Sequence, residues 1–285
     1  MGKQIYGVVG YPVRHSLSPA MQNAAFEACG IDAEYGPYEI KPEDLAGFLA
    51  DAPKKFSGLN VTVPHKILAK NFVERHGSLD EGAARIGAVN TILLMNGGFQ
   101  GFNTDGSGFC RSLSEDLRFN VSGKNVLLLG AGGAGRAIAM SLGKEPKHIY
   151  VADVAPNRYE DLKEHFGRFF DNRLMSPAGL HALPEIMEGV DLVINATPLG
   201  MKDGDPLPID IALLRPGLYV YDLVYNVPET RLVGEARRVN ASAATGIGML
   251  LYQGAIAFEI WTGHAAPVDI MRLALEKALK GSHGV

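Results

Sequence analysis

The sequence has 285 residues, a length that accommodates two domains of ordinary size. Its net charge of −4 and its 20% of charged residues exclude the strongly basic surface of a nucleic-acid-binding protein. No apolar run reaches the length of a membrane-spanning helix, about 18 residues, and the first residues lack a signal-peptide pattern. We therefore expect a cytoplasmic protein without nucleic-acid or membrane partners, in which Cys29 and Cys110 are free thiols.

Short apolar runs alternate with segments of helical periodicity in the first part of the chain. Strands are predicted over residues 3–10, 34–40 and 57–63. Helices are predicted over residues 19–30, 42–52 and 64–77, the last opening on Pro64. Residues 88–105 predict a β-hairpin that turns at Asn96-Gly97-Gly98.

The later part of the chain continues the alternation. Strands are predicted over residues 124–130, 148–154, 191–197 and 218–224, with helical patterns between them, and two helices over residues 250–263 and 267–280. This alternation predicts an α/β protein with largely parallel sheets. From about Gly106 onward the pattern is that of a doubly wound nucleotide-binding unit.

The segment KNVLLLGAGGAGRAIAMSLG contains the pattern G-x-G-x-x-G at Gly130, Gly132 and Gly135. The pattern follows an apolar strand over residues 126–129 and opens a helix over residues 134–142, which distinguishes a dinucleotide-binding loop from a chance cluster of glycines. Gly130 allows a tight turn, Gly132 lets a pyrophosphate approach the backbone, and Gly135 lets helix and strand pack closely. The helix N-terminus then meets the phosphates.

The second strand of this unit ends near Asp153, 23 residues after Gly130. A carboxylate at this position accepts hydrogen bonds from the adenosine ribose of NAD and repels the 2′-phosphate of NADP. Val154 follows directly, and the first cation of the kind that an NADP site needs is Arg158. The residues therefore favour NAD, although an aspartate here could instead cap the next helix.

In NVTVPHK the predicted strand ends near Val63, and the predicted helix places Lys66 in its first turn. A helix N-terminus disfavours a cation, so this position and partial burial would make the lysine a better proton-transfer group. Asn60 and Thr62 alternate along the strand and are predicted to face the region of Lys66. A solvated lysine is the alternative on this motif alone.

Asp105 and Asn90 have two interpretations each. Asp105 precedes a glycine, a common turn context, and Asn90 in GAVNT is similarly ambiguous between a turn and a site. Both belong to a group of polar residues at strand ends and turns. Ligands of open α/β sheets bind beyond the carboxyl ends of the strands, which favours a site.

The segment VRHSLSPAM holds two serines ahead of a proline. Ser18 is predicted to cap a helix whose first position Pro19 takes. If the segment is extended, Ser16 and Ser18 point the same way, and both hydroxyls flank a helix N-terminus that suits an anion. The histidines nearby in sequence, His15 and His65, are interpreted as scaffold, and the eight histidines of the chain lack metal-ligand spacing, so no metal is expected.

Motifs along nearly the whole chain resemble those of shikimate dehydrogenases. In the order of that family, the sequence contains HSLSP, NVTVPHK, GAVNT, NTDG, GAGGAGRA, NATPLGM, DLVYN and GMLLYQGA, between Gly10 and Trp261. NVTVPHK and GMLLYQGA are far more specific than the glycine loop. The resemblance implies NADPH-dependent reduction of 3-dehydroshikimate to shikimate, a step of chorismate and aromatic amino-acid biosynthesis.

The resemblance also implies an organisation and a set of roles. Residues 1–105, completed by the helices of residues 247–285, would form an α/β substrate-binding domain with a mostly parallel sheet; residues 106–246 would form the Rossmann domain, with a cleft between the two. Lys66 and Asp105 match the catalytic pair. The family's positions that bind the substrate carboxylate match Ser16, Ser18 and Tyr225. The positions that bind the ring hydroxyls and the reacting group match Asn60, Thr62, Lys66, Asn90, Asp105 and Gln253.

Cofactor-binding positions of the family match Gly130, Ala131, Gly132, Gly133, Ala134, Gly135, Asp153, Arg158, Thr197, Leu199, Met201, Gly246 and Met249. NADP-using relatives usually carry Asn-Arg-Thr or Asn-Arg-Ser after the second Rossmann strand, where this chain has Asp153-Val154-Ala155. The family implies NADP(H) and the local residues favour NAD(H). We predict that NAD is used at least comparably with NADP.

The sequence leaves other functions to weigh. An NAD-dependent quinate/shikimate dehydrogenase is favoured by Asp153 and disfavoured by Ser18, where quinate-preferring relatives often have Thr. A non-catalytic ligand sensor would be expected to lose Lys66, Asp105 or the glycine loop, and all are present. A folate-linked dehydrogenase of the same two-domain plan is disfavoured by the serine pair together with Lys66 and Asp105. We expect a monomer or a homodimer.

Overall fold

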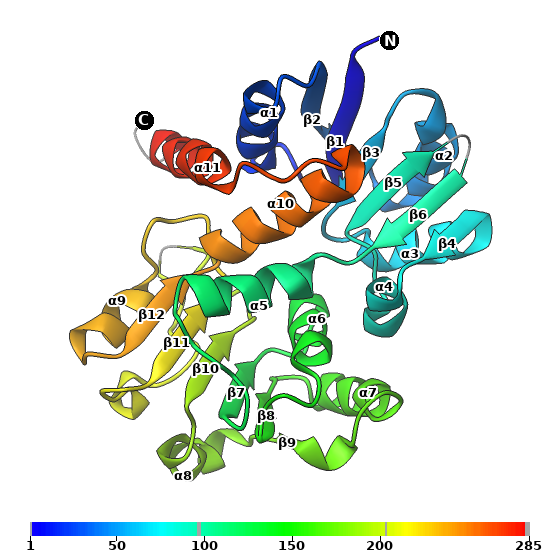
Figure 1. Cartoon of the computed structure of the whole chain (residues 1–285). Coiled ribbons are helices and arrows are strands. Elements are labelled where there is room, and N and C mark those ends of the chain that lie inside the picture. Colours follow the sequence, from blue (N-terminus) through cyan, green and yellow to red (C-terminus); the bar gives the residue numbers. More distant parts are fainter. Residues whose placement is uncertain (1, 96–97, 203, 283–285) are drawn as a thin grey trace. The chain divides into compact units, whose positions relative to one another are not determined.

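The computed structural model describes residues 2–95, 98–202 and 204–282. The chain forms two compact units, Met1–Gly108 with Leu251–Val285, and Phe109–Leu250. Each unit has a sheet of its own, as Figure 1 shows. Helices α5 (Asp105–Glu115) and α10 (Ile247–Thr262) carry the chain from one unit to the other.

The sheet of the first unit has the strand order β2-β1-β3-β5-β6-β4. β1 pairs in parallel with β2 and β3, and β4 with β6, whereas β5 runs antiparallel to β3 and β6. The predicted hairpin is built into this sheet, which is therefore mixed, with parallel pairings in the majority; the hairpin's turn residues Asn96 and Gly97 lie outside the described residues. The strands are β1 (Gln4–Gly10), β2 (Ala33–Glu39), β3 (Gly58–Val61), β4 (Gly77–Leu79), β5 (Thr91–Met95) and β6 (Gly98–Phe102).

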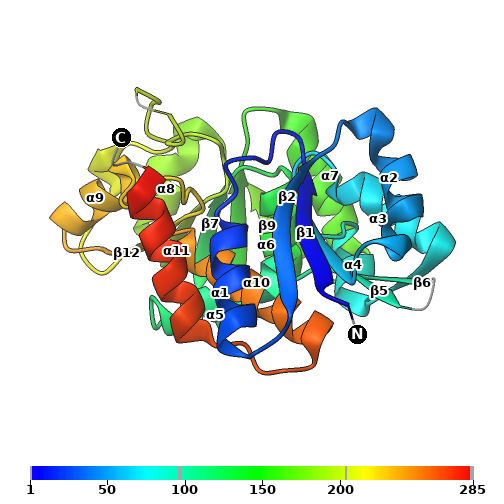
Figure 2. The same cartoon turned by 90° about the horizontal axis from the view of Figure 1, so that it is seen from above.

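Helices pack against this sheet and contribute residues to its core. α1 (Ser18–Ala28) and α11 (Val268–Ser282) lie side by side, as Figure 2 shows from above. Further along the chain are α2 (Leu45–Asp51), α3 (Lys66–His76) and α4 (Glu81–Ile86). Burying each large aliphatic side chain stabilises the fold by about 1.5–3 kcal/mol, and the core residues from these strands and helices include Leu45, Leu49, Leu59, Val61, Val73 and Ile92.

The second unit has a parallel sheet of order β12-β11-β10-β7-β8-β9. The chain starts in the middle of this sheet, moves outward to one edge, and returns to build the other half. This is the doubly wound order of dinucleotide-binding folds, so the predicted fold class is confirmed. The strands are β7 (Asn125–Leu129), β8 (His148–Ala152), β9 (Met175–Pro177), β10 (Leu192–Asn195), β11 (Tyr219–Asp222) and β12 (Ser242–Thr245).

Helices of the second unit connect these parallel strands: α6 (Gly133–Leu142), α7 (Pro156–Gly167), α8 (Leu183–Glu188) and α9 (Arg231–Arg238). β7 and β10 are neighbours in the sheet although they are distant in sequence. The strand order reverses between them, and in open α/β sheets ligands bind beyond the carboxyl ends of the strands at such a point.

Three short strands were not predicted from the sequence. β4, β9 and β12 have the sequences GSL, MSP and SAAT, which lack the apolar or β-branched composition of an independent strand. Each lies at an edge of its sheet, where it has one neighbouring strand. Pairing to a neighbour that is already in place, rather than local propensity, makes these residues extended.

Candidate active site

Lys66 is the first residue of α3, and His65 is its N-cap. The prediction of Lys66 in the first helical turn is confirmed, but the prediction that Pro64 opens the helix is wrong. Residues 62–65 form a turn instead, in which the His65 N–H donates to the Thr62 carbonyl at 2.9 Å. The fully buried His65 ring bonds through Nε2 to the Ile40 carbonyl at 2.8 Å, which fixes the start of α3.

Asp105 is the first residue of α5, and its carboxylate forms an ion pair with Lys66. Lys66 Nζ lies 2.6 Å from Asp105 Oδ2, and the two side chains are 30% and 10% exposed. The Asp105 N–H donates to Asn103 Oδ1 at 3.1 Å, and the helix N-terminus favours the negative charge. Asp105 therefore begins a helix, and its side chain joins two segments that are distant in sequence.

Asn90 holds the other oxygen of Asp105. Its Nδ2 donates to Asp105 Oδ1 at 2.9 Å and to Thr104 Oγ1 at 3.0 Å, while its Oδ1 accepts from the Thr104 N–H at 2.8 Å. Asn90 is 2% exposed. Because both ends of its amide are bonded, the amide orientation is fixed, and with it the position of the Asp105 carboxylate.

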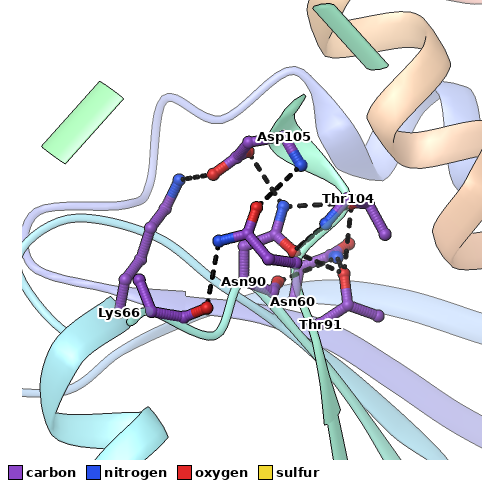
Figure 3. Close-up of polar contacts among 8 residues, drawn as sticks. Asn60, Lys66, Asn90, Thr91, Thr104 and Asp105 are labelled. Carbon is purple, nitrogen blue, oxygen red and sulfur yellow. Dashed lines mark hydrogen bonds and ion pairs between the residues drawn. The ribbon is translucent and has the colours of Figure 1, made fainter. Parts of the chain in front are cut away.

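Asn60 extends this arrangement into the sheet. It lies on β3 directly opposite Thr91 of the antiparallel strand β5. Its Nδ2 donates to Thr91 Oγ1 at 3.0 Å and to the Asn90 carbonyl at 3.2 Å. Figure 3 shows the resulting polar network, which we define as Asn60, Lys66, Asn90, Thr91, Thr104 and Asp105.

The start of α1 differs from the prediction. The N-cap is Leu17, which has helical backbone angles (φ −83°, ψ −11°), and Ser18 and Pro19 are the first two helical residues. Ser16 makes the capping-type contact, since its Oγ accepts from the Ser18 N–H at 3.3 Å. The segment is a turn rather than extended, with the Ser16 N–H bonded to the Val13 carbonyl at 3.0 Å. Proline is tolerated anywhere in the first turn of a helix, so Pro19 can take the second helical position. The N-cap is then Leu17, one residue earlier than predicted.

Ser18 is 6% exposed at the start of α1, and Tyr35 is 2% exposed on β2. The Tyr35 hydroxyl donates to Asn60 Oδ1 at 2.7 Å. Burial raises the pKa of Tyr35 well above its ordinary value, so this residue stays a neutral phenol. Tyr35 is thus connected to the polar network through Asn60.

The other predicted substrate-binding residues lie at separate places. Thr62 follows β3 and is partly buried, and Gln253 is 8% exposed on α10; both belong to the first unit. Tyr225 belongs to the second unit, where it is 40% exposed. Of the predicted substrate set, the structure thus brings together Asn60, Lys66, Asn90 and Asp105 by hydrogen bonds.

The glycine loop lies between β7 and α6, at the point where the strand order reverses. Gly130 has φ +95°, and a Cβ there would lie 2.9 Å from the Ala196 carbonyl carbon at the end of β10. A Cβ on Gly135 would collide with the Gly130 carbonyl oxygen. By contrast, nothing lies within 4 Å of a Cβ built on Gly132. As predicted, Gly130 forms the tight turn, Gly132 leaves the backbone accessible, and Gly135 allows the helix to approach the end of the strand closely.

Asp153 follows β8 and organises this loop. Its Oδ2 accepts from the Ala131 N–H at 2.8 Å, and its Oδ1 accepts from the Ala155 N–H at 2.8 Å. Its side chain is 4% exposed, and Arg158 Nη1 lies 3.9 Å from Oδ2. The N-cap of α7 is Ala155, so Asp153 does not cap that helix in the usual position. Val154 is 93% exposed.

The NATPLGM segment forms a loop after β10. Asn195 Oδ1 accepts from the Thr197 hydroxyl at 2.7 Å, and Thr197 Oγ1 accepts from the Leu199 N–H at 3.2 Å. Asn195 Nδ2 donates to Asp222 Oδ1 at 2.8 Å. Met201, further along, is 51% exposed.

Asp222 is fully buried at the end of β11, and burial raises the pKa of its carboxyl. Besides Asn195, it accepts from the Thr230 hydroxyl at 2.7 Å and from the Val224 N–H at 3.2 Å. Asp222 thereby anchors both the loop that carries Thr197 and the start of α9.

Replacing Asp222 with alanine is expected to lower the free energy of unfolding by about 2–4 kcal/mol, because three buried donors lose their acceptor. Chemical denaturation of the variant and of the parent protein measures this difference. A matched change at the exposed Asp210, whose carboxylate contacts only a local N–H, should stay within about 1 kcal/mol. Equal losses at the two positions would contradict the anchoring role.

Two further residues named from the sequence lie beyond β11. The Gly246 N–H donates to the Val224 carbonyl at 3.1 Å, and a Cβ at this glycine would collide with the Leu223 carbonyl oxygen. The Met249 N–H donates to the Tyr221 hydroxyl at 3.1 Å, and Tyr221 also bonds to Ser112 at 2.7 Å. Both the turn at Gly246 and the start of α10 are therefore held by defined contacts.

Cys29 and Cys110 are unpaired, as predicted, and burial raises the pKa of Cys110 to about 11. In residues 2–95, 98–202 and 204–282, no group of three or more His, Cys, Asp or Glu side chains is arranged to hold a metal ion. Of the helices in the described part of the chain, none has the length and apolarity to cross a membrane.

Comparison with known proteins decides the family. Residues 8–92 match the model of the shikimate dehydrogenase substrate binding domain, and residues 246–276 that of the shikimate 5′-dehydrogenase C-terminal domain. The chain is 42% identical over 284 residues to shikimate dehydrogenase (NADP(+)) of Methanopyrus kandleri, covering 97% of this chain and 96% of the relative. The chain belongs to the shikimate dehydrogenase family. The family and enzyme class predicted from the motifs are confirmed.

Solved structures agree with this assignment. A crystal structure of a shikimate dehydrogenase in complex with NADP+ superposes with a TM-score of 0.90 at 37% identity, covering 97% of this chain and 96% of the other. A quinate dehydrogenase from Corynebacterium glutamicum in complex with NAD gives a TM-score of 0.87 at 28% identity, covering 96% and 99%. The name of the Methanopyrus relative gives NADP+, which does not support the predicted preference for NAD.

Three residues of this region, Thr91, Thr104 and Tyr35, were not predicted from the sequence. Thr91 and Thr104 lie inside the motifs GAVNT and NTDG. Because they are adjacent in sequence to Asn90 and Asp105, they could have been predicted as members of the same site. Tyr35 lies in a strand whose partners are distant in sequence, and only the parallel pairing of β2 with β1 brings it near Asn60.

Proposed function

We propose that this chain catalyses the reversible oxidation of shikimate to 3-dehydroshikimate with a nicotinamide nucleotide. The observation that carries the proposal is the pair of Lys66 and Asp105, 2.6 Å apart and held by Asn90 and Asn60 within one polar network. Lys66 is partly exposed at a helix start, so a substrate hydroxyl can reach its ammonium group. Full-length relatives named shikimate dehydrogenase (NADP(+)) support the same reaction.

In the direction of oxidation, residues of the first unit carry out the proton transfer. Lys66 in its neutral form takes the proton from the reacting hydroxyl, and in reduction its ammonium returns the proton to the carbonyl oxygen. Asp105 orients Lys66 and accepts a hydrogen bond from the neighbouring hydroxyl. Asn90 prevents the carboxylate from turning away. When bound, the nicotinamide accepts or supplies the hydride.

The second unit has the features that a dinucleotide requires. A Cβ built on Gly132, the N-cap of α6, or on Gly133, its first residue, would have no neighbour within 4 Å, which leaves room for a pyrophosphate against the backbone N–H groups of the helix N-terminus. We propose that Phe109–Leu250 binds the cofactor and that Met1–Gly108 with Leu251–Val285 binds the substrate. The proposed cofactor residues are Gly130, Ala131, Gly132, Gly133, Ala134, Gly135, Asp153, Arg158, Thr197, Leu199, Met201, Gly246 and Met249.

NAD is the proposed cofactor, used at least as well as NADP. The buried carboxylate of Asp153 beside the glycine loop lies where an adenosine ribose is bound in such folds, and it is unfavourable for a 2′-phosphate. The following side chain, Val154, is exposed and offers no positive charge. Arg158 is the nearby cation, and its guanidinium already faces Asp153.

For the substrate carboxylate we propose Ser16 and Ser18, with Tyr225, and for the ring hydroxyls Asn60, Thr62, Asn90 and Gln253. Replacing Ser18 with alanine is expected to raise KM for shikimate and to lower stability by about 1 kcal/mol, because Ser18 is buried in the first turn of α1. Ser16→Ala is expected to raise KM with a smaller loss of stability, since Ser16 is partly exposed. Steady-state kinetics and thermal unfolding of both variants measure this, and equal, small effects would contradict the carboxylate role.

A quinate/shikimate dehydrogenase is the second candidate. The similarity in structure to a quinate dehydrogenase in complex with NAD, and the residues Asp153 and Val154, favour it. Ser18 disfavours quinate, because quinate-preferring relatives often have the bulkier threonine there.

Product analysis with each acid tests both candidates. Purified protein is incubated with shikimate or quinate and a nicotinamide nucleotide, and the product is identified by mass spectrometry. We expect 3-dehydroshikimate from shikimate, with quinate turned over more slowly. Turnover of quinate at a rate comparable with or above that of shikimate would select the second candidate, and turnover of neither acid would contradict both.

A further inference from the structure

Tyr221 is a fully buried residue of β11 to which the proposed reaction assigns no role. Its ring packs edge-on against Phe109, with ring centroids 5.0 Å apart. Its hydroxyl accepts from the Met249 N–H at 3.1 Å and bonds to the Ser112 hydroxyl at 2.7 Å. A buried phenol near the end of a strand thus joins the first turn of α10 to α5, within the second unit.

The hydroxyl hydrogens in this contact have defined directions. Ser112 Oγ donates its single hydrogen to Asp116 Oδ2 at 2.6 Å, because a carboxylate only accepts hydrogen bonds. The Tyr221 hydroxyl must then donate to Ser112, while its oxygen accepts from Met249. The hydrogen bonds therefore run in one direction from the Met249 N–H through Tyr221 and Ser112 to Asp116, and we call this arrangement the Tyr221 chain. Hydrogen bonds aligned in this way polarise and strengthen one another.

The Tyr221 chain acts as a cap for α10. Met249 is the third residue of this helix, and the first N–H groups of a helix have no acceptor within the helix. Tyr221 supplies an acceptor for one of them from a strand that is distant in sequence. Gly248 allows the close approach, since a Cβ there would collide with Asp116 Oδ2 and Ser112 Oγ. The position of the first turn of α10 therefore depends on a side chain of β11.

Tyr221 and its neighbour Asp222 hold two segments of the proposed cofactor site. Asp222 anchors the loop that carries Thr197, and Tyr221 anchors the turn that carries Met249. Both segments belong to the half of the sheet formed by β10, β11 and β12, across the strand-order reversal from Asp153. A doubly wound sheet binds one mononucleotide with each half. Because Asp153 lies where the adenosine is bound, the half with β11 is expected to take the nicotinamide part.

We propose that Tyr221 is a positioning residue for the cofactor, which through the Tyr221 chain holds Met249 in place for the nicotinamide part of the nucleotide. The inference rests on the proposed function, which assigns Met249 to the cofactor site. Its consequence is specific. Loss of the Tyr221 hydroxyl weakens binding of a nucleotide that carries a nicotinamide, and it leaves binding of the adenosine part and of shikimate unchanged.

The test compares Tyr221→Phe with the parent protein in binding NADH and in binding ADP-ribose, a fragment that lacks the nicotinamide. Isothermal titration measures both dissociation constants, with NADPH and 2′-phospho-ADP-ribose in their place if NADP is the better cofactor. In the variant, the Kd of the dinucleotide is expected to rise about three- to tenfold, the contribution of one hydrogen bond. The Kd of the fragment should agree with the parent value within about twofold.

Steady-state kinetics and a second substitution extend the test. In Tyr221→Phe, KM for the nucleotide is expected to rise with the Kd, while KM for shikimate at saturating nucleotide changes less than about twofold. Ser112→Ala removes the acceptor of the Tyr221 hydroxyl but leaves the bond to Met249, so it should weaken dinucleotide binding less than Tyr221→Phe does. Adding Ser112→Ala to Tyr221→Phe is expected to cause no further loss of dinucleotide affinity, since the chain is already broken.

Tyr6→Phe is the matched control. Tyr6 is also buried, at 1% exposure, but it belongs to the first unit, where its hydroxyl donates to Gln4 Oε1 at 2.6 Å. Thermal unfolding should show losses of stability in both variants, while the Kd of the dinucleotide changes for Tyr221→Phe alone.

The outcomes separate the inference from the proposed function. An unchanged Kd of the dinucleotide in Tyr221→Phe, an equal increase for the fragment, an increase matched by Tyr6→Phe, or a further loss on adding Ser112→Ala would overturn the positioning role while the reaction stands. A parent protein that binds neither NADH nor NADPH would contradict the proposed function and the inference together.

Discussion

Replacing Lys66 with alanine is expected to lower kcat for shikimate oxidation by about 10²–10⁴-fold, the usual contribution of a positioned proton-transfer group. Lys66 is the member of the polar network whose side chain ends in an amine, it is partly exposed to a substrate hydroxyl, and Asp105 holds it at 2.6 Å. The remaining members of the network keep their mutual bonds, so shikimate is expected to bind within about tenfold of the parent affinity. Steady-state kinetics and isothermal titration with shikimate measure the two quantities.

Lys70→Ala provides the control. Lys70 lies one turn further along α3, where it forms an ion pair with Glu74 at 2.7 Å, away from Asp105. This substitution removes the same charge from the same helix and should leave kcat within about twofold. Near-normal turnover in Lys66→Ala, or an equal loss in Lys70→Ala, would refute the proton-transfer role.

Replacing Val154 with arginine is expected to raise the ratio of kcat/KM for NADP to that for NAD by about 10–100-fold. The new guanidinium would lie beside the position of the 2′-phosphate, and a charge-assisted hydrogen bond contributes about 1.5–3 kcal/mol. Val154 is 93% exposed, so the longer side chain meets no obstacle in the fold. Steady-state kinetics with each nucleotide at saturating shikimate measures the ratio.

Val154→Gln separates charge from size at the same position. Glutamine is long and polar but neutral, and it is expected to change the ratio by less than about threefold. If both substitutions shifted the ratio equally, or if neither did, the adenosine ribose would not lie beside residues 153 and 154 in the bound state.

The sequence predicted well the features that are determined locally. At Gly130 and Gly135 the backbone contacts leave no room for a Cβ, so only glycine fits. The spacing of these glycines therefore predicted the strand–loop–helix start of the second unit. The position of Lys66 followed from the strand end and the proline before it, even though the helix begins after that proline.

Contacts between distant segments were less predictable. The polar network joins the end of β3, the start of α3, the start of β5 and the start of α5, and the hydrogen-bond partners depend on the register of β3 against β5. Ser18 illustrates the limit at the level of one residue. Its local pattern indicated a helix cap, but the capping contact is made by Ser16, and Ser18 is instead the first residue of the helix, with its side chain buried.

The central claim is that this member of the shikimate dehydrogenase family oxidises shikimate and uses NAD at least comparably with NADP. The most direct measurement is kcat/KM of the unmodified protein for shikimate with each nucleotide. We expect turnover with both, and a value for NAD equal to or greater than that for NADP. Failure to oxidise shikimate would contradict the assigned reaction, and a large preference for NADP would contradict the role given to Asp153 and Val154.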